Sequence, residues 1–306
     1  MKKISIMVPY RVFDKYLEEC LNGINKIDYD NFEVILLPDK ITKEDKKYIV
    51  KETGMVKPSI KRNLGSKISK GEIFAFIDAD AYPRKDWLIN AVKYFKDDSV
   101  GIVGGPNLTP KNVNMWEKIS GDCLSMFICS GVAAIRYKII KGTKNVMELP
   151  SCNLLIRKEL FNVFDETLLT AEDTKLCFEV KKKNKKILYA PDVVIYHHRR
   201  DSLWKHLKQM WIYGRDVAFL IKEEFSFDKL YYSLLSLWII FLVIGGIISI
   251  FNEIIRYFFF GVILIYFVVI LISCLVVNLK RSLLDFFTVI LTHISYGLGF
   301  VYGLTK

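Results

Sequence analysis

The stretch Ile73-Phe74-Ala75-Phe76-Ile77-Asp78-Ala79-Asp80 decides how the rest of this chain is interpreted. Its five apolar residues are typical of a short buried strand, and two aspartates follow where that strand ends. Residues i and i+2 of an extended chain point the same way, about 6–7 Å apart, so both carboxylates can face one divalent cation. Carboxylates suit Mg²⁺ or Mn²⁺, often together with a phosphate-bearing ligand. The alternative is a loop with two solvated acids.

Strand-like and helix-like patterns alternate on both sides of this stretch. Apolar runs predict strands over residues 4–8, 32–37, 73–77, 100–103 and 193–196, and helices are predicted over residues 13–24, 43–52, 63–69, 87–95 and 174–181. Such alternation over short connections predicts an α/β fold class with a mostly parallel sheet covered by helices. Ligands of these sheets bind beyond the carboxyl ends of strands, where Asp39, Asp78 and Asp80 fall.

Three long apolar stretches lie near the end of the chain, over residues 230–251, 257–279 and 283–304. Each is long enough to cross a hydrocarbon core of about 30 Å. They are apolar all round and separated by short polar turns, which favours three transmembrane helices over buried helices of a soluble domain. The Lys280-Arg281 turn is expected to face the cytoplasm. We therefore predict a multi-pass protein of the cell membrane whose residues before Leu230 lie in the cytosol.

Composition and charge agree with a membrane-bound protein. The 306 residues carry a net charge of +11, which suits attachment to an anionic leaflet. Nucleic acid is the competing partner of a basic chain. No nucleic-acid motif accompanies the charge here, so we predict no nucleic-acid partner. The six cysteines show no C-x-x-C spacing, which predicts neither a zinc site nor a disulfide framework and suits a reducing cytosol.

An ordered succession of segments resembles family-2 glycosyltransferases of the GT-A fold. Residues 4–11, 34–39, 61–65 and 71–80 look like the nucleotide-sugar half of that family, and residues 150–157 with Ala171-Glu172-Asp173 look like its acceptor half. The tail His293 to Gly299 resembles the last span of membrane-anchored members. The resemblance implies a Rossmann-like nucleotide-diphospho-sugar transferase domain over residues 1–200. An interfacial segment over 201–229 and a membrane domain over 230–306 would follow.

The resemblance also implies roles for donor-side residues. Nucleotide-sugar binding falls to Pro9, Arg11, Asp39, Arg62, Asn63 and Asp78. The resemblance implies that Asp80, with Asp78, binds the metal, Mn²⁺ or Mg²⁺. Only one of His197 and His198 is expected to join them, because adjacent residues of a strand face opposite sides. We slightly favour His198. Arg11 departs from the small or Asn-like residue commoner in the family, and Arg62 and Asn63 are expected to open a helix, where Arg62 is either a diphosphate ligand or a solvated residue.

On the acceptor side, Asp173 matches the family's catalytic carboxylate. It would take the proton of an acceptor hydroxyl, and its alternative role is a helix N-cap. Residues 201–224 carry an apolar stripe with aromatic rings and cations, as in a helix lying in the headgroup layer or packed on the domain. A positional expectation assigns acceptor binding to residues 104–107 and 116–129, and individually to Asn107, Asn153, Glu172, Trp211 and Arg215.

These features predict an inverting, metal-dependent enzyme of cell-envelope glycan biosynthesis. It would move one sugar from a nucleotide-diphospho-sugar donor to a lipid-linked acceptor, either a polyprenyl phosphate or a lipid-carried glycan. Gln209 lacks the Gln-x-x-Arg-Trp context of processive synthases, which favours single addition. The alternatives are a sugar nucleotidyltransferase, although no glycine-rich loop follows the first strand, and a noncatalytic scaffold. The Gly299-x-x-x-Gly303 spacing is consistent with packing between spans or with a homo-oligomer.

Overall fold

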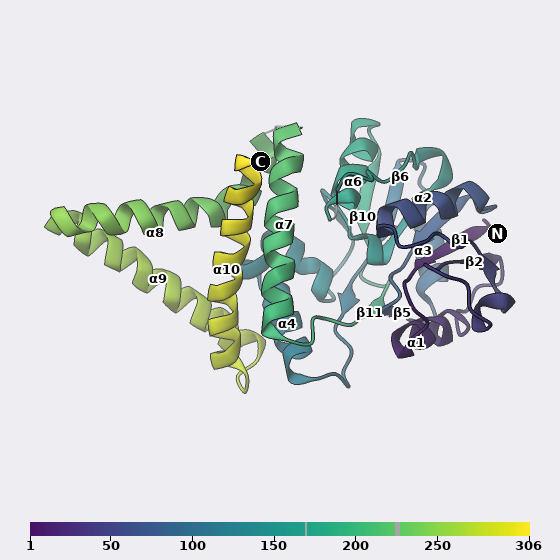
Figure 1. The fold of residues 1–306 in the computed structure, drawn as a ribbon, viewed down its shortest axis with the longest axis horizontal. Helices are drawn as coiled ribbons and strands as arrows, with labels where there is room; N and C mark the ends of the chain where they lie inside the picture. The colour runs from purple at the N-terminus through teal and green to yellow at the C-terminus, as the bar shows by residue number, and fades with distance from the viewer. Residues whose placement is uncertain (169, 224–226) are drawn as a thin grey trace. The chain divides into compact units, whose positions relative to one another are not determined.

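A computed structural model describes residues 1–168, 170–223 and 227–306 of the chain (Figure 1). The chain forms two compact units that exchange a segment. The first unit comprises Met1–Lys111 and Ile135–His198, and the second comprises Asn112–Ala134 and Arg199–Lys306. The segment Asn112–Ala134 therefore belongs with the C-terminal helices, although it lies between two parts of the first unit in the sequence.

An eight-stranded sheet forms the centre of the first unit, in the order β3-β2-β1-β4-β9-β6-β10-β8. Its neighbours are parallel except that β9 is antiparallel to β4 and β6, and β8 is antiparallel to β10, so the sheet is more mixed than predicted. Its strands are β1 (Ile4–Pro9), β2 (Phe32–Leu37), β3 (Ile49–Val50), β4 (Ile73–Phe76), β6 (Val100–Gly104), β8 (Lys144–Asn145), β9 (Leu154–Arg157) and β10 (Lys186–Tyr189).

Both faces of this sheet are covered, and the residues of β4 show why. Ile73 and Ala75, with Ile77 directly after the strand, enter one core, with α1 (Lys15–Ile24) and α3 (Trp87–Tyr94). Phe74 and Phe76 enter the other core, with α6 (Glu172–Lys182), while α2 (Pro58–Ile68) packs on β1 and β2. A continuous apolar run is what a strand buried on both faces requires.

A second, three-stranded sheet in the order β5-β11-β7 joins distant parts of the first unit. It consists of β5 (Ala81–Pro83), β11 (Ile195–His197) and β7 (Asn107–Leu108). β11 is antiparallel to β5, and His197 pairs with Ala81. Because β5 begins directly after Asp80, this register brings His197 to the end of β4.

Two local predictions are corrected by the structure. Residues 43–52 do not form a helix but the short 3₁₀ helix η1 (Glu44–Lys47) and strand β3, because the β-branched pair Ile49-Val50 joins the sheet beside β2. The helix predicted from Asn63 begins at Pro58, a residue suited to a first helical position. The remaining 3₁₀ helices are η2 (Gly131–Tyr137), η3 (Ser151–Asn153), η4 (Lys158–Leu160) and η5 (Phe227–Ser233).

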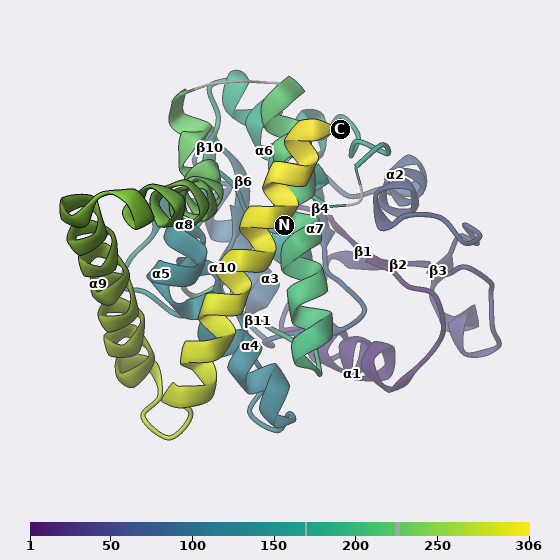
Figure 2. The same ribbon diagram turned by 60° about the vertical axis from the view of Figure 1, so that its left-hand side comes forward.

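The second unit is helical. It contains α4 (Met115–Ser125), α5 (Phe127–Ser130), α7 (Leu203–Glu223), α8 (Leu234–Phe251), α9 (Glu253–Val277) and α10 (Ser282–Thr305). Among the described residues, three segments are long and apolar enough to cross a membrane, namely Leu230–Phe251, Glu253–Val277 and Ser282–Thr305, in agreement with the predicted stretches. α4 and the bent segment after it (Phe127–Tyr137) also pass that test as a pair. Figure 2 shows α7 and α10 side by side, with α8 and α9 forming a separate hairpin.

Candidate functional site

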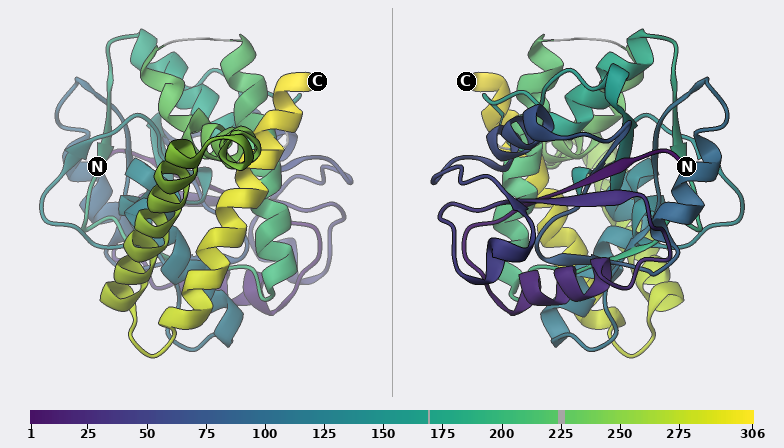
Figure 3. Two further views of the ribbon diagram at one scale, coloured as in Figure 1. Left: turned by 90° about the vertical axis from the view of Figure 1, so that its left-hand side faces the viewer. Right: turned by 90° about the vertical axis from the view of Figure 1, so that its right-hand side faces the viewer.

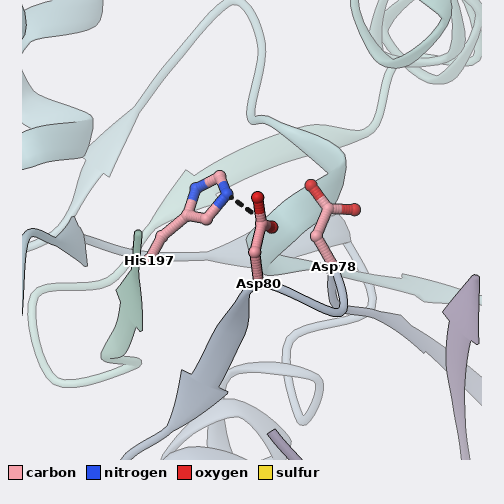
Figure 4. Close-up of side chains that lie close together, drawn as sticks. All are labelled: Asp78, Asp80 and His197. Carbon is pink, nitrogen blue, oxygen red and sulfur yellow. Dashed lines mark hydrogen bonds and ion pairs between the residues drawn. The ribbon is translucent and has the colours of Figure 1, made fainter. Parts of the chain in front are cut away.

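Asp78, Asp80 and His197 converge beyond the carboxyl end of β4 (Figure 4). One ligand atom from each lies within 4.8 Å of the others, and His197 Nε2 lies 3.0 Å from Asp80 Oδ1. All three side chains are partly exposed, so a ligand from solvent can reach them. Burial lowers the pKa of His197, but the charges of Asp80 and Cys152 and the hydrogen bonds to both together outweigh this effect and raise that pKa to about 10. Two carboxylates and one imidazole make a donor set suited to a divalent cation.

His198, the favoured histidine of the sequence prediction, lies elsewhere. Its Nε2 is 2.7 Å from Glu19 Oε2, and its ring packs against Tyr16 with 4.7 Å between centroids. The two histidines face opposite sides of the chain, as expected for adjacent residues. The structure thus corrects the preference for His198 and brings its alternative, His197, to the aspartate pair.

Arg62 links the aspartate pair to the predicted acceptor half. Its Nη2 lies 2.6 Å from Asp78 Oδ1, and its Nη1 lies 2.9 Å from Glu172 Oε1. Arg62 is 2 % exposed, and it lies inside α2 and not at its start. Burial and the neighbouring charge of Asp173 raise the pKa of Glu172 to about 7, against the opposing effect of Arg62. The solvated alternative for Arg62 is therefore wrong.

Asp173 is held in place by two backbone groups. The amides of Ser151 and Thr174 donate to its two carboxylate oxygens, each at 2.8 Å. Burial raises its pKa above the ordinary value although the Ser151 amide opposes the shift. The N-cap of α6 is Ala171, whose φ of 64° is left-handed, so Asp173 lies within the helix and the N-cap alternative is corrected.

Asp39 is paired with a residue that the sequence did not single out. Lys61 Nζ donates to the Asp39 carboxylate and to the backbone carbonyls of Tyr10 and Leu37, at the ends of β1 and β2. Burial lowers the pKa of Lys61, and Asp39 opposes this shift. No local pattern marks Lys61, because lysine usually points into solvent. Among the other predicted donor residues, Pro9 ends β1 and is buried, whereas Arg11 is exposed.

Three predicted asparagines serve the scaffold. Asn63 exchanges hydrogen bonds with the backbone of Phe164, and Asn153 donates to the carbonyls of Pro106 and Val193 and accepts from Trp87 Nε1. Asn107 is 1 % exposed, and its amide lies 3.4 Å from the Cys152 sulfur. Their side chains contact the interior of the first unit, and the binding roles expected of them stay predictions. Gly104 and Gly105 likewise lie against neighbouring backbone.

Trp211 and Arg215 belong to the second unit, where both contact helical residues of that unit. The Trp211 ring lies 5.1 Å from that of Tyr302 on α10, and Arg215 forms an ion pair with Asp216. Their predicted role in acceptor binding stays a prediction. All six cysteines are free and buried.

Comparison with known proteins adds a family and a fold. The family model described as "Glycosyltransferase like family 2" matches residues 2–214. A curated relative, the dolichyl N-acetyl-alpha-D-glucosaminyl phosphate 3-beta-D-2,3-diacetamido-2,3-dideoxy-beta-D-glucuronosyltransferase of Methanococcus voltae, is 25 % identical over 244 residues, covering 74 % of this chain and 76 % of that protein.

Two solved structures share the fold. The mannosyltransferase PcManGT of Pyrobaculum calidifontis, in complex with GDP-Man and Mn²⁺, aligns with a TM-score of 0.56 and 16 % identity over 93 % of this chain and 88 % of that one. Residues 1–349 of S. aureus TarS with UDP-GlcNAc align with a TM-score of 0.50 and 16 % identity, covering 98 % and 90 %. The mixed sheet of the first unit is thus a GT-A sheet.

Proposed function

The chain belongs to the glycosyltransferase-like family 2 and is a glycosyltransferase, and from this premise we propose a specific reaction. The enzyme moves a single sugar from a nucleotide-diphospho-sugar to a lipid-linked acceptor, with inversion, at the cytosolic face of the cell membrane. The acceptor is a polyprenyl phosphate or a lipid-carried glycan. The observation that carries the proposal is the convergence of Asp78, Asp80 and His197 at a strand end, with Glu172 tied to Asp78 through Arg62.

Asp78, Asp80 and His197 would hold Mn²⁺ or Mg²⁺ in this proposal. Their oxygen and nitrogen atoms lie close enough together to share one ion, and both carboxylates remain partly exposed. When bound, such an ion supplies Lewis-acid stabilisation of the charge on the departing nucleoside diphosphate. The P. calidifontis mannosyltransferase, which has the same fold, was solved in complex with GDP-Man and Mn²⁺.

The residues of the chain perform the remaining steps. Asp39, held by Lys61, contacts the nucleobase, and Arg62 fixes Asp78 and Glu172 in place. Asp173 accepts the proton of the attacking acceptor hydroxyl, and the burial that raises its pKa makes it a stronger base. Attack on the anomeric carbon opposite the leaving phosphate inverts that centre. A lipid phosphate is already anionic, so such an acceptor would depend less on Asp173.

A lipid-linked acceptor is supported from two directions. The name of the M. voltae relative describes a dolichyl-linked sugar phosphate as its acceptor. The chain itself has three helices that are long and apolar enough to enter a membrane. Anchoring the enzyme would confine it to the surface where such acceptors are found.

The test uses purified full-length protein in detergent with Mn²⁺ and a panel of nucleotide sugars. Release of nucleoside diphosphate is measured with and without a membrane lipid extract, in the wild type, in Asp80→Asn and in Asp28→Asn. Asp28 is a matched control because its exposed carboxylate lies 3.4 Å from Lys85, outside the cluster. We expect lipid-stimulated release from one donor, lost in Asp80→Asn and kept in Asp28→Asn. Absence of release from every donor, or full activity of Asp80→Asn, would contradict the proposal.

A further inference from the structure

We propose that α7 and α10 lie together in the surface layer of the bilayer, and that α8 and α9 are the C-terminal helices that cross it. The inference rests on the membrane attachment proposed above, but it concerns the position of the helices and not the reaction. It replaces three predicted C-terminal spans with two. It also puts the C-terminus on the same side of the membrane as the first unit, called the catalytic unit from here on because it carries the candidate active site.

α7 and α10 run in the same direction and touch along their shared length. Hydrogen bonds join the early parts of the contact, such as His206 Nε2 to Thr292 Oγ1 at 2.9 Å and Ser295 Oγ to the Leu207 carbonyl at 2.7 Å. Further along, the contacts pair, in chain order, Trp211 with Gly299, Arg215 with Gly303 and Lys222 with Leu304. The partner on α10 advances as the residue on α7 advances, so the helices are parallel neighbours.

Glycines bring the two backbones into direct contact. A Cβ atom on Gly299 would lie 2.1 Å from the carbonyl oxygen of Trp211, and one on Gly303 would lie 2.4 Å from that of Arg215. From the other side, a Cβ on Gly214 of α7 would lie 2.2 Å from the carbonyl oxygen of Tyr296. Small residues allow this close approach between helices. The Gly299-x-x-x-Gly303 spacing thus serves packing within the chain, and two helices joined in this way share one depth in a membrane.

α7 is too polar to cross the hydrocarbon core. Charged side chains occur from its beginning to its end, namely Lys205, Lys208, Arg215, Asp216, Lys222 and Glu223. Ionised groups in the bilayer centre are costly, and α7 is absent from the candidate spans found among the described residues. An amphipathic helix of this kind lies in the headgroup layer. Because α10 accompanies α7, α10 lies in that layer too.

α10 itself is suited to a boundary between protein and lipid. In its candidate span, 44 % of residues are buried within the structure and the mean hydropathy is 1.5. The spans containing α8 and α9 are each 11 % buried, with mean hydropathies of 2.7 and 3.1. The buried side of α10 carries Thr288, Thr292 and His293. Its exposed side is an apolar stripe that fits the acyl chains beneath the headgroups: Leu284, Phe287, Leu291, Leu298 and Tyr302.

The direction of α8 agrees with this arrangement. In Figure 1 α8 runs crosswise to α7 and α10, and the left view of Figure 3 looks almost along α8 while α7 and α10 lie across the view. If α8 crosses the bilayer, α7 and α10 therefore lie roughly in its plane. The turn at Asn252 then emerges on the far side, and Lys280-Arg281 returns to the near side.

The inference is tested by labelling cysteines in the full-length protein with a membrane-impermeant maleimide. The native cysteines are buried, so the unmodified chain is the background control. Reporters are placed at three exposed positions: Met55→Cys in the catalytic unit, Phe251→Cys at the hairpin tip and Lys306→Cys at the C-terminus. Each is labelled in intact cells and again after permeabilisation.

We expect Met55→Cys and Lys306→Cys to be labelled from the same side and Phe251→Cys from the opposite side. If Lys306→Cys is labelled with Phe251→Cys instead, α10 crosses the membrane and the inference is overturned. Labelling of all three from one side would show that the hairpin does not cross, which also overturns it. Donor turnover, measured on the same preparations, reports on the proposed reaction separately, so the two proposals can fail independently.

Discussion

The two units of this chain place their acidic side chains in opposite ways. Asp78 and Asp80 of the catalytic unit keep 30 % and 36 % of their side chains exposed and meet His197 at one point. In the helical unit, Asp122 accepts from both Nε and Nη2 of Arg281, and Asp216 is 2 % exposed beside Arg215. Acids that solvent reaches can bind a ligand, whereas the Asp122–Arg281 ion pair connects α4 with the N-cap residue of α10. Under the proposed function, similar residue types serve chemistry in one unit and packing in the other.

The largest effect is expected from Asp80→Asn, which changes the solvent-exposed Asp78–Asp80–His197 cluster and leaves the acids of the helical unit unchanged. Loss of a ligand to a charge-stabilising ion should remove several kcal/mol from the transition state, a decrease of about 10³-fold or more in kcat. The melting temperature should change little because the side chain is partly exposed. Steady-state assays and thermal melts of the same samples check both expectations. A large fall in melting temperature would mean that Asp80 stabilises the fold, as Asp122 and Asp216 are expected to do.

A pair of lysine substitutions sharpens the contrast within the helical unit. Leu264→Lys puts a charge near the middle of α9, on an exposed position, and should lower membrane integration by about 3 kcal/mol. Leu291→Lys, on the exposed face of α10, should cost much less because the ammonium can reach the headgroups. The measurement is the fraction of chain that resists alkaline extraction. Equal losses would indicate that α10 has the same membrane depth as α9.

Gly299→Leu tests the contact that holds α7 against α10. Because a Cβ there meets the Trp211 carbonyl at 2.1 Å, the helices must separate, at a cost of about 1–3 kcal/mol. The matched control is Gly261→Leu on α9, where a Cβ meets nothing within 4 Å. Thermal melts in detergent should show a drop of several degrees for the first variant and almost none for the second. Equal melting temperatures would show that the glycine contact contributes little.

The smallest effect concerns Glu172 and pH. Its pKa rises from 4.5 to about 7 on folding, so between these values the folded chain keeps a proton that the unfolded chain has released. Stability contributed by this group is therefore present below pH 4.5 and is lost as pH rises through 7. Melting temperatures compared at pH 5 and pH 7.5 should fall less in Glu172→Gln than in the wild type. An unchanged slope in the variant would assign the dependence to other groups.

The sequence predicts best what depends on neighbouring residues. The strand ending in Asp78 and Asp80 is recognisable because its apolar run and its acids are adjacent, and the apolar stretches identify the helices that can enter a membrane. Choosing between His197 and His198 requires the register of β11 on β5, which no local pattern contains. The ion pairs of Arg62 with Glu172 and of Lys61 with Asp39 were beyond prediction because the partners lie 110 and 22 residues apart in the sequence. The pairing of α7 with α10 likewise depends on tertiary packing.

The segment Asn112–Ala134 has a consequence for how the protein is made. Asp122 of this segment is synthesised 159 residues before its partner Arg281. At ordinary rates of synthesis, α4 therefore stays without that partner for on the order of ten seconds. A chain shortened after the catalytic unit would never supply that partner and would leave part of α4 uncovered. A catalytic part isolated by truncation should therefore aggregate. Aggregation should be avoided if residues 112–134 are replaced by a short loop or if the missing helices are co-expressed.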